Sequence, residues 1–497
     1  FNFRGRATRA EYWWWQLFGT VVVVALALIS VLLNYGMLLA EAASLLLVFP
    51  TLSLNTRRLH DINISGWVQV VFPAWWFGFK SSDKGPNSYG PAPYHPVEGT
   101  SENQFWAMDF PPYVSLWLAV FFSSCAWTTF LMAQIWLVFE ATDSHFLVAA
   151  STSVFSISFL VWVLVGGFIA DRVDRRKVLQ FCQIAFVALG LYVAISITTD
   201  LLKWWHLIGV SILMGTITAF YFPAKLAIIP QLVRQERTDN AIVFVQIGVL
   251  SATILGPALS GAIIALLGVE FAFYTAVGLW VLALAAITSL RSSLPVVQKV
   301  RTSVISDITT GIRYMRDNKN LHVLLAAAVL FYLFWTPFKS LMPVLVVNVY
   351  NKGPLESGLL ITLGGIGVLF GTLLIAFLRT YKRGQVLLSA GLLTGLGLVL
   401  TALIPNYWAG ATSILILSIG AGGWMVLIVV LAIGLTEPRY HGRVASLLLI
   451  ITILPPLLST LIAGGLAATT GVQTALGLFG MALILFTLVL FLSPIGR

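Results

Sequence analysis

The chain has 497 residues, of which 59% are hydrophobic and only 10% are charged, and its mean hydropathy is +0.93. Soluble domains carry about 25% charged residues, so this composition excludes an ordinary soluble globular protein. Apolar runs of about twenty residues recur along nearly the whole length, which predicts an all-α polytopic membrane protein. The formal net charge of +10 follows membrane topology, as shown below, and no nucleic-acid partner is expected.

The first element in chain order is a small membrane module over residues 1–79, with spans predicted near Glu11–Leu33 and Glu41–Leu54. Arginines precede the first span, and Arg57 and Arg58 follow the second. Because basic residues favour the cytoplasmic side, both ends of this two-span unit are expected in the cytoplasm.

The segment WVQVVFPAWWFGF at 67–79 follows the two spans. As a helix it would reach only about 20 Å, against a hydrocarbon core of about 30 Å. Its Trp and Phe residues are typical of the membrane interface. We therefore predict an in-plane or re-entrant element, which leaves fourteen spans in the whole chain.

Four ordered motifs in this region, FRGRATRAEYWW, RRLHD at 57–61, SGW at 65–67 and GPNSYGPAP at 85–93, resemble the YhaH-like bacterial inner-membrane proteins. That family brings no known activity. Arg57, Arg58, His60 and Asp61 could grip an anionic lipid headgroup, or they could anchor a helix end at the interface. The module could also dock a partner protein, and membrane lipids are expected partners of the whole chain.

Residues 80–112 are rich in Pro, Gly and Ser and are predicted to form a cytoplasmic linker. A twelve-span body follows, with six spans in residues 113–290, a basic linker at 291–320, and six spans in 321–497. The spans are expected near 113–138, 146–170, 178–198, 204–228, 241–267, 271–290, 321–347, 355–378, 385–404, 408–435, 444–468 and 472–493.

The connections between these spans alternate in charge. Clusters such as Arg175–Lys177 and Arg379–Arg383 lie on one side, whereas the opposite side carries only Lys203 and Lys352. This is the positive-inside pattern. It predicts a multi-pass protein of the bacterial cytoplasmic (inner) membrane with both termini in the cytoplasm.

The body contains an internal repeat. Two segments resemble each other: RQERTDNAIVFVQIGVLSATILGPALSGAIIALLGV at 234–269 and EPRYHGRVASLLLIITILPPLLSTLIAGGLAATTGV at 437–472. Repeated halves are common in secondary transporters. GGFIADRVDRRKVL at 166–179 resembles the signature loop of the major facilitator superfamily, with Asp174 where Gly is usual. The variant resembles the branch that includes enterobactin and macrolide exporters, and the resemblance implies a fold of two six-helix halves.

The resemblance implies a conformational latch in that loop, formed by Gly167, Asp171, Arg172, Arg175 and Arg176. Asp171 would lie near the N-terminus of the eleventh helix, whose dipole favours a carboxylate. It would pair with Lys225 at the end of the fourth helix and hold the cytoplasmic side shut. The alternative is that the loop is basic only for topology.

The fifth helix carries GPALSG, which partly matches an antiporter motif of the superfamily through Gly256, Pro257 and Gly261. This motif favours export. The 19 acidic residues all fall in loops, linkers or span ends, and the branch's frequent Asp in the first helix is Trp127 here.

In this fold the first, fourth, seventh and tenth helices line the cavity. The resemblance therefore implies that the substrate contacts a set of residues on these helices: Gln134, Tyr221, Tyr332, Trp335 and Trp424. Any single aromatic residue of the set could instead only pack against neighbouring helices. Lys339, past the midplane of the seventh helix, could be a counter-ion for an anionic substrate or could extend to the outer interface.

Three hypotheses follow. The chain could export an amphipathic or aromatic small molecule, it could translocate a lysophospholipid or other lipid, or it could be a non-transporting scaffold subunit. No nucleophile–base pair or metal cluster is recognisable, so we expect neither an enzyme nor a cofactor or metal requirement.

Overall fold

The computed structural model describes residues 51, 54–57, 59, 111–170, 172–233, 238–290, 318–377, 382–437 and 440–493. The chain forms two compact units, Phe1–Val114 with Leu232–Phe244, and Ser115–Gln231 with Val245–Arg497. In the first unit, the Tyr113 hydroxyl donates a hydrogen bond of 2.7 Å to the Ala241 carbonyl. Only Thr51 and Leu54 of the expected N-terminal spans are described, and of the expected linker 80–112 only Pro111 and Pro112, which already belong to the first helix of the body. The rest of these segments lies outside the described residues, and the domain boundaries stay predictions.

Twelve helices in the described part of the chain are long and apolar enough to cross a membrane. This confirms the all-α fold, and the helices coincide with the twelve spans expected for the body. The first six are α4 (Pro111–Thr142), α5 (His145–Ala170), α6 (Arg175–Thr198), α7 (Trp204–Leu232), α8 (Thr238–Leu267) and α9 (Val269–Thr288).

The second half contains the other six spans. Its first span is broken at Thr336, because Pro337 has no backbone N–H to continue the helix. The segments are α11 (Lys319–Trp335), α12 (Pro337–Asn348), α13 (Pro354–Phe377), α14 (Arg383–Leu403), α15 (Tyr407–Gly434), α16 (His441–Thr470) and α17 (Val472–Phe491).

Short polar residues define several helix starts. Asp174, the unusual residue of the signature loop, is the N-cap of α6, and its carboxylate accepts a 2.9 Å hydrogen bond from the backbone N–H of Arg176. Asn406 similarly caps α15 by accepting from the backbone of Trp408 at 3.0 Å and Ala409 at 3.2 Å. Such caps satisfy backbone donors that have no partner within the helix.

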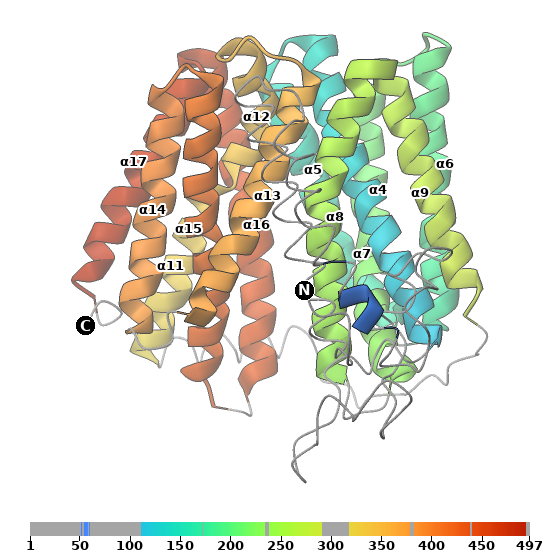
Figure 1. Ribbon diagram of the computed structural model, residues 1–497, viewed down its shortest axis with the longest axis horizontal. Helices are drawn as coiled ribbons and strands as arrows, with labels where there is room; N and C mark the ends of the chain where they lie inside the picture. Colours follow the sequence, from blue (N-terminus) through green and yellow to red (C-terminus); the bar gives the residue numbers. More distant parts are fainter. Residues whose placement is uncertain are drawn as a thin grey trace. The chain divides into compact units, whose positions relative to one another are not determined.

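Two six-span bundles, α4–α9 and α11–α17, lie side by side (Figure 1). We call the end where Ala170 precedes α6 the signature-loop end, and the end where Thr142 precedes α5 the far end. Helix α5 packs along α16, so the bundles meet through helices of both halves. The proline-bearing helices of the sequence repeat, α8 and α16, both take part in this junction.

Hydrogen bonds join the two halves on the far side of the body. Thr362 of α13 donates to the Ile254 carbonyl of α8 at 2.8 Å, and Ser153 of α5 donates to the Leu457 carbonyl of α16 at 3.3 Å. The first of these bonds lies three residues before Pro257, inside the GPALSG motif's helix.

His145, at the far end itself, contacts two helices of the second half. Its Nδ1 lies 3.1 Å from the Ala467 carbonyl and its Nε2 lies 3.0 Å from the Asn348 side-chain nitrogen. Since a carbonyl only accepts, Nδ1 carries the proton in this arrangement. We call this set of contacts between the halves, from His145 to Ser153–Leu457 and Ile254–Thr362, the far seam.

Candidate functional site

A cavity of about 430 Å³ lies toward the signature-loop end from the far seam. Helices α4 to α9 of the first half and α16 of the second half line it. The lining residues are Ser123, Ser124, Trp127, Thr128, Phe155, Ser156, Phe159, Phe186, Thr218, Tyr221, Phe222, Lys225, Val249, Thr253, Trp280, Leu449, Thr452, Ile453 and Pro456. We call it the central cavity.

Aromatic rings form much of its wall. Trp127 lies against Phe155 with ring centroids 4.7 Å apart, and Phe186 stacks on Trp280 at 5.4 Å. Phe186 also meets Tyr221 edge-on at 6.0 Å. These pairs come from different helices, so their packing fixes the shape of the wall and leaves apolar surface for a ligand.

Lys225 is the cationic residue of the central cavity. Its side chain is only 9% exposed, and its Nζ lies 5.3 Å from the Phe222 ring centroid and 5.6 Å from that of Tyr221. No Asp or Glu is among the described residues that line the cavity. The rings supply a cation–π contact, which offsets part of the cost of burying the charge.

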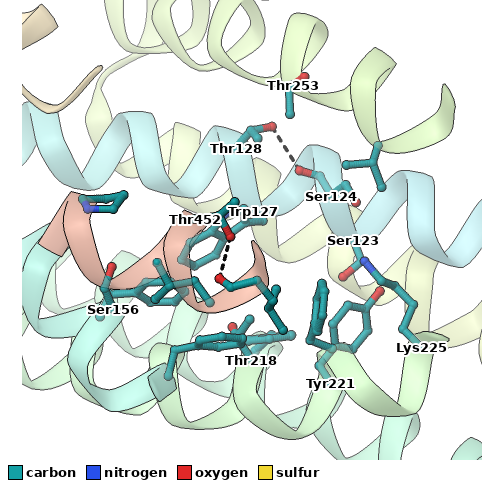
Figure 2. A pocket seen from close by; sticks show the side chains of 18 of the residues that line it. Ser123, Ser124, Trp127, Thr128, Ser156, Thr218, Tyr221, Lys225, Thr253 and Thr452 are labelled. Carbon is teal, nitrogen blue, oxygen red and sulfur yellow. Dashed lines mark hydrogen bonds between the residues drawn. The ribbon is translucent and has the colours of Figure 1, made fainter. Parts of the chain in front are cut away.

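Two hydroxyl groups lie beside this ammonium group. Figure 2 shows the polar atoms of Ser123, Tyr221 and Lys225 directed toward one another at one end of the cavity. Ser123 accepts a 2.9 Å hydrogen bond from the side-chain amide of Gln183, which is completely buried. A hydroxyl that accepts in this way retains its own proton for donation.

Three hydroxyl groups elsewhere in the wall donate to the backbone of their own helices. Ser156 donates to the Thr152 carbonyl at 3.2 Å, Thr218 to Met214 at 2.7 Å, and Thr452 to Leu449 at 2.7 Å. These three groups therefore present acceptor lone pairs to the cavity.

The substrate residues expected from the sequence are dispersed. Tyr221 lines the central cavity, whereas Gln134 is buried and donates to the Ser211 hydroxyl at 2.5 Å, which ties α4 to α7. Trp424 is fully buried and stacks on Phe331 with centroids 4.6 Å apart. Their role as substrate contacts stays a prediction.

The other three expected substrate residues lie on the broken seventh span. Tyr332 and Trp335 are buried in the second half. Lys339 is exposed, although most of its neighbours on α12 are buried, and its Nζ lies 4.8 Å from the Trp335 ring centroid. None of the three is among the described residues of the central cavity lining.

Sequence reasoning did not select Ser123, Phe155, Phe186 or Trp280, which the fold brings together from four helices. It placed Lys225 near a helix end, but α7 continues to Leu232, so the lysine is seven residues inside. The apolar segment FPAKLAIIPQL could have indicated that the helix continues to Leu232. Its two prolines, however, made the end of the helix difficult to recognise from the sequence.

The residues of the expected latch are only partly described. Asp171 lies outside the described residues, and a Cβ added at Gly167 would meet nothing within 4 Å. The Arg172 guanidinium lies over the Phe168 ring, 3.9 Å from its centroid. The latch between the halves therefore stays a prediction.

Arg175 and Arg176 connect helices of the first half. Arg175 donates through Nε to the Ala170 carbonyl and through Nη1 to the Ala227 carbonyl, both at 3.2 Å. Arg176 donates through Nη2 to the Thr288 carbonyl at 2.7 Å. Arginine at helix C-termini satisfies carbonyls left without helical partners. These two residues thus hold the ends of α5, α7 and α9 together.

The two glycines of the GPALSG motif contact different helices. A Cβ at Gly256 would collide with Thr128 of α4, within the first half. A Cβ at Gly261 would lie 2.5 Å from the Pro354 carbonyl oxygen and 3.0 Å from Cα of Gly358, both at the start of α13. Small residues here allow the backbones of α8 and α13 to approach closely.

Comparisons with known proteins agree with this architecture. A family model described as transmembrane secretion effector matches residues 106–496, and a model of a protein family of unknown function (DUF805) matches residues 1–91. Macrolide efflux protein A of Streptococcus pyogenes is 24% identical over 317 residues, which cover 63% of this chain and 74% of that protein.

The N-terminal region and the fold have separate relatives. Inner membrane protein YhaH of Escherichia coli (strain K12) is 29% identical over 105 residues, which cover 18% of this chain and 87% of that protein. The crystal structure of the nucleoside transporter NupG matches with a TM-score of 0.63 at 13% identity, covering 77% of this chain and 98% of that one. The chain therefore belongs to the major facilitator superfamily, in its transmembrane secretion effector family, and carries a YhaH-like domain ahead of the transporter body.

Proposed function

We propose that this membrane transporter exports an amphipathic or aromatic small molecule by alternating access. The observation that carries the proposal is the central cavity, which has aromatic walls and lies on one side of the far seam. Its volume of about 430 Å³ falls within the range of about 300–1,000 Å³ found for small-molecule sites. This space favours transport over a scaffold role, in which side chains would fill the centre.

The direction of access follows from charge. The signature-loop end carries Arg172, Arg175, Arg176 and Lys177, so the positive-inside rule assigns it to the cytoplasm. A substrate would then enter the central cavity from the cytoplasmic side while the far seam is closed. The name of the macrolide efflux relatives supports movement outward.

Export requires the far seam to open and the signature-loop end to close. The far seam contains few hydrogen bonds and close contacts between small residues such as Gly261 and Gly358. Contacts of this kind separate without leaving a charge buried. On the cytoplasmic side, the expected pairing of Asp171 with Lys225 would replace them.

A disulfide across the far seam tests this cycle. A Cβ at Gly365 of α13 would lie 3.6 Å from Cα of Ile254 of α8, and its one closer neighbour is the Ile254 side chain itself, so cysteines at these two positions are near bonding distance. In proteoliposomes, oxidation of the Ile254→Cys/Gly365→Cys protein should stop the flux of a fluorescent naphthyl amphiphile, and reduction should restore it. Each single-cysteine variant is the control. Flux that persists in the fully cross-linked protein would contradict alternating access.

A further inference from the structure

The charged residues of the central cavity are a property of this chain that does not follow from its family. Its described lining contains one cation, Lys225, and no Asp or Glu. On α4, the lining residue Trp127 is aromatic. A buried ammonium group is costly unless an anion or several hydrogen-bond acceptors face it. Among the described residues of the cavity, the rings of Tyr221 and Phe222 and the hydroxyls of Ser123 and Tyr221 surround the Lys225 ammonium group, and none of these groups is an anion.

We propose that the central cavity selects an anionic amphiphile, whose acidic group binds Lys225 and whose apolar part packs on the aromatic wall. This deepens the proposed function and rests on it. Carboxylate, sulfonate and phosphate share the required chemistry, because each presents several acceptor oxygens to an ammonium group.

The neighbours of Lys225 fit an anion better than they fit a neutral or cationic group. The hydroxyls of Ser123 and Tyr221 lie beside the ammonium group (Figure 2). Ser123 accepts from Gln183, and the Ser123 and Tyr221 hydroxyls also hydrogen-bond to each other, so one of their two protons remains for a ligand. The anion would thus meet one charged donor and one hydroxyl donor. An ammonium group has three N–H bonds, so Lys225 can bind such a ligand and still take the pairing expected with Asp171.

The opposite end of the cavity fits the apolar part. Trp127 lies against Phe155 there, and the edge-on pair of Phe159 and Phe222, with centroids 6.1 Å apart, continues the aromatic wall toward Lys225. Hydroxyl groups at that end donate to their own helices. They therefore offer no free donor for a second acidic group. The cavity is polar at one end and apolar at the other, which matches a single-headed amphiphile.

A matched pair of probes tests the charge preference directly. 2-Naphthoate and 2-naphthylmethylammonium share one ring system and differ in the sign of the charge. Calorimetric titration of the purified full chain in lipid nanodiscs should show binding of the naphthoate at least about tenfold tighter, since one charge-assisted hydrogen bond accounts for a difference of this size. Equal affinities, or tighter binding of the cation, would overturn the proposal.

Three lysine variants assign the preference to one side chain. Lys225→Gln should lose the tenfold preference, and Lys225→Arg should retain it because it keeps the charge. Lys203→Gln is the matched control, since Lys203 also lies over a ring, 5.1 Å from the centroid of Trp205, but outside the cavity. Melting curves verify folding, and a preference that survives in folded Lys225→Gln would also overturn the proposal.

The binding experiments and the transport experiments can fail independently of each other. A charge preference in binding without any flux would leave this site intact and contradict export, whereas flux of both probes at equal rates would contradict the charge preference alone. Competition then identifies the source of the anion. Displacement of naphthoate by lysophosphatidylglycerol would support the site as a lipid site, and displacement only by water-soluble aromatic acids would support it as a metabolite site.

Discussion

The Thr362 hydroxyl of α13 donates a 2.8 Å hydrogen bond to the Ile254 carbonyl of α8. Its counterpart is the bond from Ser153 of α5 to the Leu457 carbonyl of α16. Thr362 lies eight residues after Pro354 and Ser153 lies eight residues after His145, where their helices begin. The two bonds are thus placed alike in the two halves, and they join each half's second helix to the other half's proline-bearing fifth helix.

Removal of these two bonds should loosen the far seam by a modest amount. A neutral hydrogen bond contributes about 1 kcal/mol, which is a factor of about five in the ratio of two states. We expect Thr362→Val with Ser153→Ala, which remove both bonds, to raise the labelling rate of a cavity cysteine, Ser156→Cys, from the far side by about twenty-five-fold, a factor of about five for each bond. The background lacks Cys125 and Cys182, and an impermeant maleimide is the reagent. An unchanged rate would show that other contacts hold the far seam.

Bulk at the glycine contact of the far seam should have a larger effect. In Gly358→Leu even the Cβ of the new side chain would lie 2.4 Å from the Pro257 carbonyl oxygen, so the seam cannot close without a backbone shift. We expect stronger far-side labelling and reduced flux. Gly209→Leu is the control, because a Cβ there meets nothing within 4 Å. Similar behaviour of the two variants would mean that helix propensity, rather than the seam, causes the loss.

The latch expected at the signature-loop end depends on the charge of Asp171. Asp171→Asn should weaken closure on the cytoplasmic side and reduce flux, while the protein remains folded, because the amide keeps the size of the carboxylate and loses its charge. Labelling of a cavity cysteine from the cytoplasmic side should increase. If both labelling and flux match those of the parent protein, the loop serves topology alone.

Arg175 is expected to act on stability. It donates to carbonyls of both α5 and α7, and lysine cannot span two acceptors with the same planar geometry. Arg175→Lys should lower the melting temperature of the detergent-solubilised protein by a few degrees, consistent with about 1–2 kcal/mol for a lost charged hydrogen bond. The naphthoate preference of the folded protein should not change. A changed preference with an unchanged melting temperature would argue for a direct role in binding.

The topology of the N-terminal module is open to a labelling test. If the segment 67–79 does not cross the membrane, the linker 80–112 is cytoplasmic. A cysteine at Ser88 should then resist an impermeant reagent added outside intact cells and react after permeabilisation. Rapid labelling in intact cells would require an odd number of spans ahead of Tyr113.

The sequence by itself determined the membrane class, the twelve spans of the body, the two-half repeat and the separate N-terminal module. These features depend on local properties: the length of apolar runs, the position of basic loops, and short motifs such as GPALSG and RRLHD. Each is a property of consecutive residues, so it can be recognised without knowing which helices are neighbours.

Only the tertiary structure decided which side chains meet. Lipid and protein interior are both apolar, so a membrane helix has no polar face that marks its exposed side. Trp424 and Trp280 are both fully buried tryptophans within apolar runs, yet Trp280 forms part of the wall of the central cavity, whereas Trp424 is not among the described residues that line it. Lys225 is within the cavity because α7 continues past it, and Tyr221 lies beside it because the two residues are one turn apart on α7. Ser123 of α4, by contrast, lies beside Lys225 only because the tertiary structure brings α4 and α7 together.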